Sequence, residues 1–280
     1  MIRFEHTIFA LPFAYVGMVL AWGTWDSANW SDFVWITIAM AAARTSAMAF
    51  NRYIDRFIDV GNPRTAERPI QKGKIDATTV LISALISTSI LAFAAWMLNP
   101  LAFILFPGAL IFLVGYSYTK RFTCLSHYVL GFTDGLAPIG AWVAVRGSVF
   151  TLEDLPAWLL LAVVTLWIGG FDVIYACQDV DFDRKHHLYS IPAVFGIGPG
   201  LMVSRVSHIL TVLVLILLGI SLTLSWPYWI GLALITGLFV YEHSLISPDD
   251  LSKLNVAFFN VNGYISLTLF AAVFLAVLLP

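Results

Sequence analysis

The stretch NRYIDRFID at residues 51–59 ends one long apolar segment and leads into a basic loop. A second stretch, YACQDVDFD at residues 175–183, ends another apolar segment far downstream. Each stretch places two aspartates four residues apart, where a hydrophobic helix is expected to meet water. Because carboxylates are costly close to a bilayer, their repetition in the same setting indicates a function for these acids.

The composition is that of a polytopic membrane protein. Of the 280 residues, 60% are hydrophobic and only 11% are charged, whereas a soluble domain usually carries about 25% charged residues. Apolar stretches close to the ~20 residues needed to cross a bilayer are expected at 7–24, 33–54, 77–97, 100–119, 127–146, 155–178, 201–222, 225–246 and 256–279. We therefore expect an all-α bundle of about nine transmembrane helices, forming a single domain over residues 1–280.

The distribution of basic residues predicts the orientation. Lys and Arg follow the second, fourth, sixth and eighth spans, whereas the opposite loops carry only Arg146. By the positive-inside rule, the N-terminus and both acidic stretches are cytoplasmic and the C-terminus is outside. The first six residues show neither a cleavable signal nor a transit region, which favours a bacterial inner membrane. Cys124 and Cys177 both fall near the predicted cytoplasmic face, so a disulfide framework is not expected.

The two acidic stretches also indicate an internal duplication. One closes the second span, the other closes the sixth, and each is followed by a loop with a proline and then a glycine. We interpret the chain as two four-helix repeats plus a ninth helix, which gives both acidic stretches the same orientation. Parallel repeats often place a ligand site at their interface, in transporters as well as in enzymes.

Helical geometry aligns polar residues on both segments, because an α-helix turns about 100° per residue. The stripe on the second span consists of Arg44, Asn51, Asp55 and Asp59. The stripe on the sixth span consists of Asp172, Tyr175, Asp179 and Asp183. Asp181 projects to the opposite side and is expected to be solvated.

Paired carboxylates suit Mg²⁺, which binds through a few carboxylates together with phosphate oxygens. Basic residues on the same predicted side match the other half of such a ligand, since arginine forks fit phosphate oxygens. These cations are Arg64, Arg68, Lys120, Arg121 and Lys185. We therefore expect a magnesium-bridged diphosphate between the two acidic stretches, with an isoprenoid tail in the bilayer. The alternative is that the aspartates are ordinary solvated helix ends and that the basic residues only set the membrane topology. This alternative explains one pair of aspartates more easily than two.

Two ionisable residues lie deeper in the predicted bundle. Arg44 falls well inside the second span, where a basic side chain is expensive. One interpretation is an ion pair with another helix, for which Asp134 is the candidate partner. The other is that Arg44 and Asp134 bind the acceptor substrate.

With these residues the chain resembles the UbiA superfamily of intramembrane prenyltransferases. The resemblance covers nearly the whole chain. It rests on Asn51-x3-Asp55-x3-Asp59, NPRTAERP at 62–69, YSYTKR at 116–121, and Tyr175-x3-Asp179-x3-Asp183. Many relatives carry Asp where this chain has Arg52, which lies at the side of the polar stripe. We expect altered neighbours there, with metal binding retained.

The resemblance implies a reaction in two stages. Mg²⁺ draws charge from the diphosphate as the allylic C–O bond breaks, and an electron-rich ring carbon beside a phenolic hydroxyl then attacks the cation. The implied metal ligands are Asn51, Asp55, Asp59, Asp179 and Asp183. Aromatic faces of Tyr175, Tyr118 or Phe171 would stabilise the cation. Asp172, Asp179 or the leaving diphosphate would accept the proton that is lost.

Within the superfamily, residues 4–12 and the Asn51-Arg52 pair are most similar to the 4-hydroxybenzoate polyprenyltransferases. Close relatives of that group prenylate dihydroxynaphthoate on the futalosine route to menaquinone. The implied substrates are therefore a polyprenyl diphosphate and a hydroxylated aromatic carboxylate, either 4-hydroxybenzoate for ubiquinone or 1,4-dihydroxy-6-naphthoate for menaquinone. Apart from these and the lipid bilayer, no nucleic acid and no obligate protein partner are expected.

An ion-coupled transporter is the alternative of another class. Its acids would bind cations during alternating access, and polar residues near the midplane should be reachable from both sides. Here the acids crowd one face, and the opposite loops are very short. A scaffold protein without activity is a further alternative, although the four aspartates of the two spaced pairs are all present.

Overall fold

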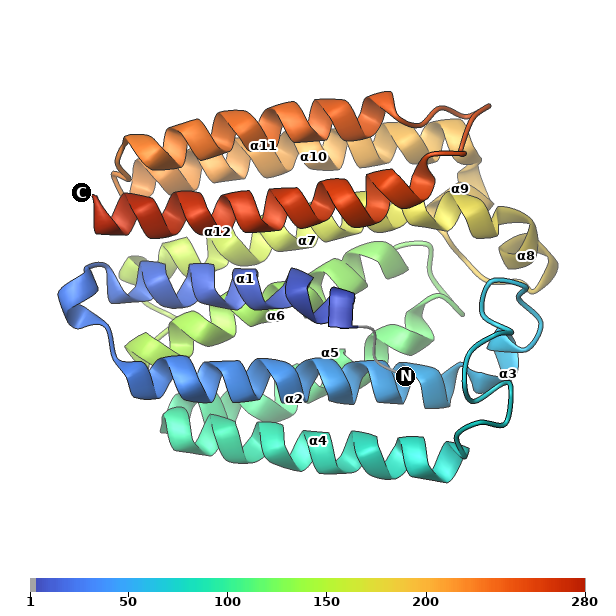
Figure 1. The fold of residues 1–280 in the computed structure, drawn as a ribbon, viewed down its shortest axis with the longest axis horizontal. Coiled ribbons are helices and arrows are strands. Elements are labelled where there is room, and N and C mark those ends of the chain that lie inside the picture. Colours follow the sequence, from blue (N-terminus) through green and yellow to red (C-terminus); the bar gives the residue numbers. More distant parts are fainter. Residues whose placement is uncertain (1–3, 280) are drawn as a thin grey trace.

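The computed structural model describes the backbone of residues 4–279 and the side chains of residues 11–279. The expected all-α fold is confirmed (Figure 1). Within these residues the long helices are α1 (Phe4–Trp22), α2 (Trp30–Ile54), α4 (Ala77–Leu98), α5 (Pro100–Thr119), α6 (Ser126–Arg146), α7 (Leu155–Ala176), α10 (Ile197–Ser221), α11 (Trp226–Ser244) and α12 (Asn262–Leu278). The short elements are η1 (Trp25–Ser27), α3 (Arg56–Asp59), η2 (Leu152–Asp154), η3 (Cys177–Asp179), α8 (Val180–Lys185), α9 (Ile191–Phe195) and η4 (Val256–Val261).

The long helices lie where the spans were predicted, but their lengths and hydropathies are not all alike. In the part of the chain that the structure describes, seven helical segments are long and apolar enough to cross a membrane. The apolar part Leu11–Trp22 of α1 is shorter than these seven, and α11 is not among them. The chain is therefore a multi-pass membrane protein, whereas the count of nine spans stays a prediction.

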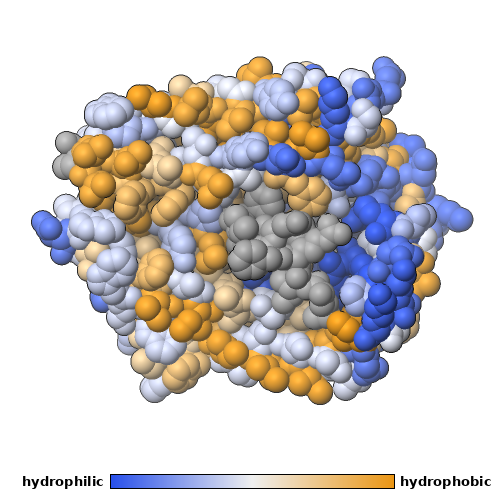
Figure 2. Space-filling model, viewed as in Figure 1, coloured by the Kyte–Doolittle hydropathy of each residue, from blue (hydrophilic) through white to orange (hydrophobic). Residues whose placement is uncertain are grey.

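Large apolar side chains cover the outer surface of the bundle. Ile86 on α4, Ile104 and Ile111 on α5, and Ile209 on α10 are each more than half exposed. Water disfavours such a surface and lipid does not. Hydrophilic side chains instead gather over the end formed by α3 and α8 (Figure 2). The molecule thus has an apolar body and one polar end.

Short capped turns close the opposite end of the bundle. Asn99, between α4 and α5, accepts a hydrogen bond from Ala102 N with its Oδ1 (2.9 Å). Its Nδ2 donates to the carbonyl oxygens of Val143 (2.8 Å) and Ala144 (2.9 Å) on α6. Gly147 ends α6 at φ 63°, a left-handed conformation that favours glycine. These bonds satisfy polar backbone groups where helices reverse direction.

The centre of the bundle is the α6–α7 pair. α7 also packs against α10, α1 packs against α6 and α12, and α2 packs against α4. Trp167 on α7 is fully buried and meets Phe13 of α1 edge to face, with ring centroids 4.9 Å apart. This packing places α3 and α8, which carry the two acidic stretches, at the same end of the molecule (Figure 1).

Glycine permits the close approach of α1 to α6. A Cβ atom on Gly17 would lie 2.1 Å from the carbonyl oxygen of Pro138, which is backbone and cannot move aside easily. We expect Gly17→Ala to lower the free energy of unfolding by about 1–3 kcal/mol, measured by thermal unfolding in detergent. Gly237→Ala is the control, because nothing lies within 4 Å of a Cβ there and alanine favours the helix. Equal melting temperatures for both variants would contradict the predicted contact.

Candidate functional site

The two acidic stretches do not continue their long helices as uniform α-helix, which differs from the single stripes we predicted. α2 ends at Ile54, and Asp55 has φ −90° and ψ 4° before α3 begins. The four-residue spacing survives, because Asp59 N donates to the carbonyl oxygen of Asp55 (2.8 Å). In the second stretch, a 3₁₀ turn (Cys177–Asp179) separates α7 from α8. A 3₁₀ turn has about three residues per turn, so it rotates Asp179 away from the direction that a continuous α-helix would give.

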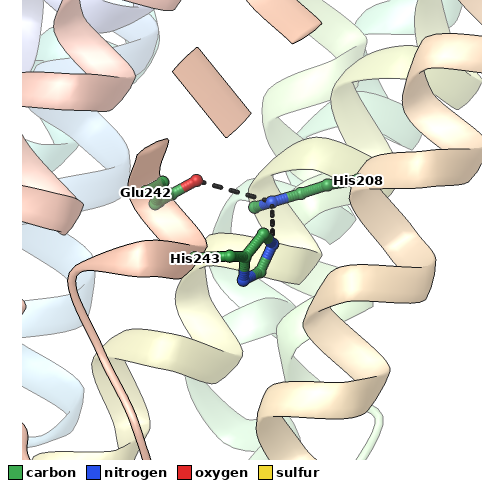
Figure 3. Close-up of side chains that lie close together, drawn as sticks. All are labelled: His208, Glu242 and His243. Carbon is green, nitrogen blue, oxygen red and sulfur yellow. Dashed lines mark hydrogen bonds and ion pairs between the residues drawn. The ribbon is translucent and has the colours of Figure 1, made fainter. Parts of the chain in front are cut away.

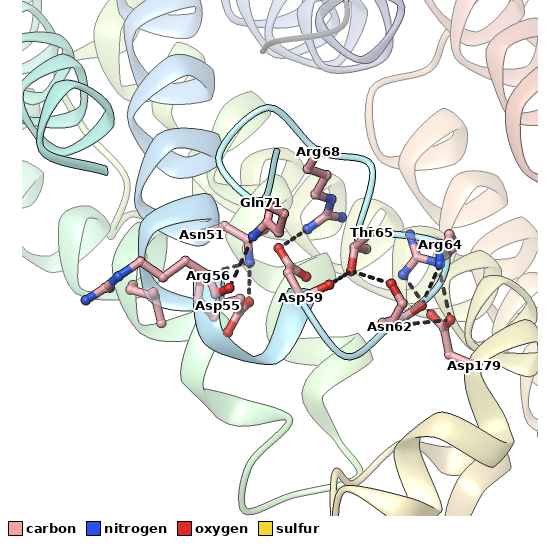
Figure 4. A network of polar contacts seen from close by, with 12 residues as sticks. Asn51, Asp55, Arg56, Asp59, Asn62, Arg64, Thr65, Arg68, Gln71 and Asp179 are labelled. Atoms are coloured by element: carbon pink, nitrogen blue, oxygen red, sulfur yellow. Dashed lines mark hydrogen bonds and ion pairs between the residues drawn. The ribbon is translucent and has the colours of Figure 1, made fainter. Parts of the chain in front are cut away.

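The first pair of acids is held by cations from two different loops. Asn51 Nδ2 donates to Asp55 Oδ2 (2.9 Å) and to Ser117 Oγ of α5 (3.2 Å). Asp55 Oδ1 accepts from Arg121 Nη2 (2.9 Å). Asp59 is buried and accepts from Arg68 Nη1 at 2.5 Å. Figure 4 shows Arg68 reaching back from its loop to Asp59.

The second pair of acids is held in the same way. The Arg64 guanidinium donates two hydrogen bonds to Asp179, from Nη2 to Oδ2 at 2.7 Å and from Nε to Oδ1 at 3.2 Å. Asn62 Nδ2 also donates to Asp179 Oδ1 (3.2 Å). Asp183, almost completely buried, is paired with Lys120 Nζ (2.8 Å) and accepts a bond from Ser190 Oγ (2.8 Å).

The loop that follows the first acidic stretch therefore contacts the second one. Arg64 and Asn62 belong to this loop, and both bond to Asp179 (Figure 4). Four of the five predicted cations each pair with one aspartate. The fifth, Lys185, is exposed at the end of α8. The structure thus joins the two halves of the chain through opposite charges.

Two of these groups lie outside the spanning segments, and their pKa values are shifted. Burial raises the pKa of the Asp55 carboxyl, although the hydrogen bond and charge of Arg121 oppose this. Burial by itself lowers the pKa of Arg64, but the hydrogen bond and charge of Asp179 outweigh it, so this pKa lies above its ordinary value. Arg64 is therefore a permanent cation at this site.

A cavity of about 1120 Å³ opens beside these pairs. The polar residues that line it include Asn51, Arg64, Arg68, Asp172 and Tyr175. Aliphatic and aromatic side chains of α2, α4 and α5 line much of the rest, among them Met40, Leu91, Leu98, Leu105 and Phe112. Among the described residues, Asp55, Asp59, Asp179 and Asp183 do not line the cavity. Three of them bond directly to a residue that does, and Asp183 lies behind Lys120, farther from it.

Arg44 and Asp134 form the ion pair that the sequence suggested. Arg44 Nη1 lies 3.3 Å from Asp134 Oδ1, and both residues line the cavity. Asp134 is on α6 and Arg44 is on α2, so the pair bridges two helices. The two interpretations of Arg44 are therefore compatible, because an ion pair in a cavity wall also faces whatever the cavity holds.

The sequence did not single out His127. Its Nδ1 lies 2.7 Å from Asp172 Oδ2, and its Nε2 accepts a hydrogen bond from the backbone N–H of Ile191 (3.2 Å). Because Nε2 accepts, Nδ1 carries the proton and donates it to Asp172. His127 and Asp172 are on α6 and α7, and no local spacing links them. Only the packing of these two helices reveals the pair.

The acidic stretches fit a hard cation. Four carboxylates and the side-chain amide of Asn51 offer oxygen donors only, which are the ligands that Mg²⁺ prefers. Asp183 Oδ1 is buried and has no hydrogen-bond partner among the described residues. A buried carboxylate oxygen without a donor is expensive, and a bound cation would satisfy it.

Comparison with known proteins decides the family. The model of the UbiA prenyltransferase family matches residues 10–278. The chain belongs to the UbiA prenyltransferase family. Two relatives named 4-hydroxybenzoate octaprenyltransferase are similar to it over most of both chains. The protein of Xylella fastidiosa (strain M12) is 30% identical over 260 residues, covering 91% of this chain and 85% of its own. That of Chromohalobacter salexigens is 32% identical over 242 residues, covering 85% and 78%.

Solved structures give the same family. A UbiA homolog from Aeropyrum pernix K1, solved in its apo state, has a TM-score of 0.89 and 32% sequence identity, covering 98% of this chain and 99% of that one. A UbiA homolog from Archaeoglobus fulgidus, solved with GPP and Mg²⁺, has a TM-score of 0.65 at 18% identity and shares the fold. The resemblance drawn from the sequence is confirmed, and UbiA membership places the chain among polyprenyltransferases rather than among transporters. The family-like residues at 4–10 lie outside the side chains that the structure describes.

Proposed function

We propose that this UbiA enzyme transfers a polyprenyl group from polyprenyl diphosphate to a ring carbon of a hydroxylated aromatic carboxylate of the 4-hydroxybenzoate type. The observation that carries the proposal is the Arg64–Asp179 pair, which joins the loop after the first acidic stretch to the second stretch, beside the polar wall of an otherwise largely apolar cavity. Such a site offers charge for a diphosphate and room for an isoprenoid chain. The relatives named 4-hydroxybenzoate octaprenyltransferase support the same reaction.

The diphosphate would bind the basic side chains that form ion pairs with the aspartates in this structure. Arg64 and Arg68 line the cavity, and Lys120 and Arg121 pair with the acids beside it. Guanidinium forks bind phosphate oxygens as they bind carboxylates. Lys185 is a further candidate from the loop beyond α8, although its side chain is exposed in this structure.

The metal would supply Lewis acidity. Mg²⁺, which Asn51, Asp55, Asp59, Asp179 and Asp183 would hold, neutralises charge that develops on the leaving diphosphate. The Archaeoglobus fulgidus UbiA homolog, solved with GPP and Mg²⁺, supports a divalent ion in this fold. The residues of the chain would position the two substrates and exclude water from the reaction.

Aromatic and apolar side chains would protect the allylic cation. Tyr175 and Phe258 stack with ring centroids 4.0 Å apart, and both line the cavity. Phe171 meets Phe258 edge to face at 5.2 Å. Aromatic faces attract cations, and apolar walls keep out the water that would otherwise capture the cation. Tyr118, the other predicted aromatic, is exposed and contacts Arg121 instead.

The acceptor would bind near Arg44 and Asp134. The guanidinium of Arg44 suits the carboxylate of an aromatic acid, and Asp134 beside it keeps that guanidinium in place. For the proton that the ring loses, Asp172 is the strongest of the candidates. It lines the cavity and is oriented by His127, whereas Asp179 does not line the cavity and is proposed as a metal ligand.

The pathway and the cellular location follow as parts of the proposal. An acceptor of the 4-hydroxybenzoate type would place the enzyme in ubiquinone biosynthesis, and 1,4-dihydroxy-6-naphthoate would place it in menaquinone biosynthesis. The positive loops put the N-terminus and the polar end in the cytoplasm of a bacterial cell, with the bundle in the inner membrane.

A direct assay tests the reaction and the acceptor together. Membranes containing the protein would receive Mg²⁺, a long-chain polyprenyl diphosphate and one of the two acceptors, and the product would be detected by mass spectrometry. We expect prenylated product from one acceptor, its loss with a chelator, and its return when Mg²⁺ is added back. Membranes without the protein are the control. Folded protein that prenylates neither acceptor, or that works equally well with chelator, would contradict the proposal.

A further inference from the structure

A second polar cluster lies inside the bundle, away from the proposed reaction. His208 of α10 and the adjacent Glu242 and His243 of α11 point toward one another (Figure 3). His208 Nδ1 is 3.0 Å from His243 Nε2 and 3.4 Å from Glu242 Oε2. His208 and Glu242 are buried, and His243 is half-buried. Ionisable residues at such positions in a membrane protein call for a partner or a function.

The ring of His208 is fixed in one orientation. It stacks on Phe239 with ring centroids 4.3 Å apart. The ring also lies close to Gly170, where a Cβ would come within 2.6 Å of His208 Nε2. Nε2 itself lies 3.3 Å from the carbonyl oxygen of Trp167. A carbonyl can only accept, so the ring proton is on Nε2, and Nδ1 turns a bare lone pair toward Glu242 and His243.

No lysine or arginine forms an ion pair with Glu242 in the part of the chain that the structure describes. Glu242 Oε2 is buried and has no hydrogen-bond partner among the described residues, and it faces the lone pair of His208 Nδ1. A neutral His243 can carry only one proton on Nε2. That proton can be donated to His208 Nδ1 or to Glu242 Oε2, but not to both. An unpaired carboxylate oxygen inside the bundle is expensive. A cation among the three ligand atoms removes this conflict.

We propose that His208 Nδ1, His243 Nε2 and Glu242 Oε2 bind a divalent transition-metal ion of the zinc type. Two imidazole nitrogens and one carboxylate oxygen suit Zn²⁺ and its neighbours, whereas Mg²⁺ prefers oxygen ligands. Two of the three separations, 3.0 and 3.4 Å, are close to the edge of about 3.4 Å in a tetrahedron with bonds of about 2.1 Å, and all three ligand atoms lie within 4.8 Å of one another. The hydrogen bond from His208 Nε2 to a backbone carbonyl is the kind that orients metal-binding histidines.

The ion would stabilise residues that line the cavity. Asn262, the first residue of α12, donates from Nδ2 to Glu242 Oε1 (2.8 Å) and to the carbonyl oxygens of Ala257 (3.1 Å) and Phe258 (3.2 Å). Its Oδ1 accepts from Trp167 Nε1 (2.6 Å). Ala257 and Phe258 belong to the π-helix η4, and Phe258, Trp167 and Asn262 all line the cavity. An ion held by Glu242 would thus connect α10 and α11 to the start of α12, so we assign it a structural role.

Cobalt is the probe for this site. Full-length protein in detergent would be stripped with chelator, titrated with Co²⁺, desalted and examined for visible absorption and for metal content. We expect about one tetrahedral Co²⁺ per chain, displaced by Zn²⁺ but not by excess Mg²⁺. Wild-type protein that retains no Co²⁺, or that binds it only in octahedral form, would overturn the proposal, and the cluster would then hold a proton instead.

Variants locate the ion. Glu242→Gln keeps the oxygen that accepts from Asn262 but removes the ligand, and His243→Gln changes a half-buried position that tolerates substitution better than His208. We expect each to weaken Co²⁺ binding roughly 100-fold or more, since even residues that only orient ligands cost 10–100-fold when changed. His187→Asn, at an exposed loop histidine with φ 54°, should leave the tetrahedral Co²⁺ unchanged. Asp179→Asn should leave the tetrahedral Co²⁺ unchanged as well, although it would weaken an ion bound at the acidic stretches. Tetrahedral Co²⁺ that persists in both cluster variants, or that is lost in Asp179→Asn, would place the ion elsewhere.

Discussion

Replacing Asp179 with Asn is expected to reduce kcat for prenyl transfer by roughly 10³-fold, the size of effect seen when one group that stabilises developing charge is removed. Asp179 is buried and accepts hydrogen bonds from Arg64 and Asn62 of the loop that follows the first acidic stretch. Asn keeps the shape of the side chain but removes the negative charge that would hold a divalent ion. The loss should appear in single-turnover assays with saturating polyprenyl diphosphate and acceptor.

The matched control for this variant is Asp181→Asn. Asp181 is two residues further along the chain and exposed, as its predicted direction away from the polar stripe requires. It should keep its activity within about twofold, because isolated surface charges contribute little. Thermal unfolding of both variants would show that the folds match. If Asp179→Asn were as active as Asp181→Asn, the acidic stretches would not form the catalytic centre.

Arg64→Lys is expected to lower kcat/KM by roughly 100-fold, mainly through a higher KM for polyprenyl diphosphate. The guanidinium now makes two bonds to Asp179 and a third to the hydroxyl of Tyr175 (3.2 Å). A diphosphate would use the same fork of donors, and a lysine ammonium presents one point charge in its place. Loss of a bidentate, charge-assisted contact of about 3 kcal/mol accounts for a change of this size. Initial rates at varied donor concentration, with acceptor held constant, measure it.

Arg146→Lys serves as the control for Arg64. Arg146 pairs with Glu153 (3.0 Å) at the other end of α6, where the Arg146 side chain is 39% exposed and that of Glu153 is 80% exposed. The same chemical change there should leave both kinetic constants unaltered. A donor KM that stays constant in Arg64→Lys, with acceptor KM raised instead, would assign Arg64 to the acceptor and contradict the proposed arrangement.

Much of the fold was predictable from local patterns. Apolar runs separated by turn residues such as Asn99-Pro100 mark the long helices, and the structure has helices at those places. What local patterns did not give is the interruption at each acidic stretch. Whether a helix ends in a 3₁₀ turn, as at Cys177–Asp179, depends on which tertiary contacts satisfy its last carbonyls.

The residues of the candidate site could be singled out in the sequence because their chemistry is repeated. Aspartates at the ends of two segments and basic residues in the following loops are visible in one sequence, and so was the possible contact of Arg44 with Asp134, which the structure contains. Which cation meets which acid was not predictable, because it depends on how the loop bearing Arg64 folds over α7. The contact of His127 with Asp172 and the approach of His208 to Glu242 arise between different helices. No spacing along the chain indicates such contacts.

The pairing of Asp55, Asp59, Asp179 and Asp183 with cations has a consequence for how the two ligands would bind. In this structure the protein serves as its own counterion, since Arg64, Arg68, Lys120 and Arg121 neutralise the acids. A divalent ion that takes the acids releases the cations, and a diphosphate that takes the cations releases the acids. Each ligand thereby frees the side chains that the other ligand needs. On the proposed function, the affinities for the ion and for the diphosphate are therefore linked. By thermodynamic reciprocity, the ion would raise the affinity for the diphosphate by the same factor as the diphosphate raises the affinity for the ion.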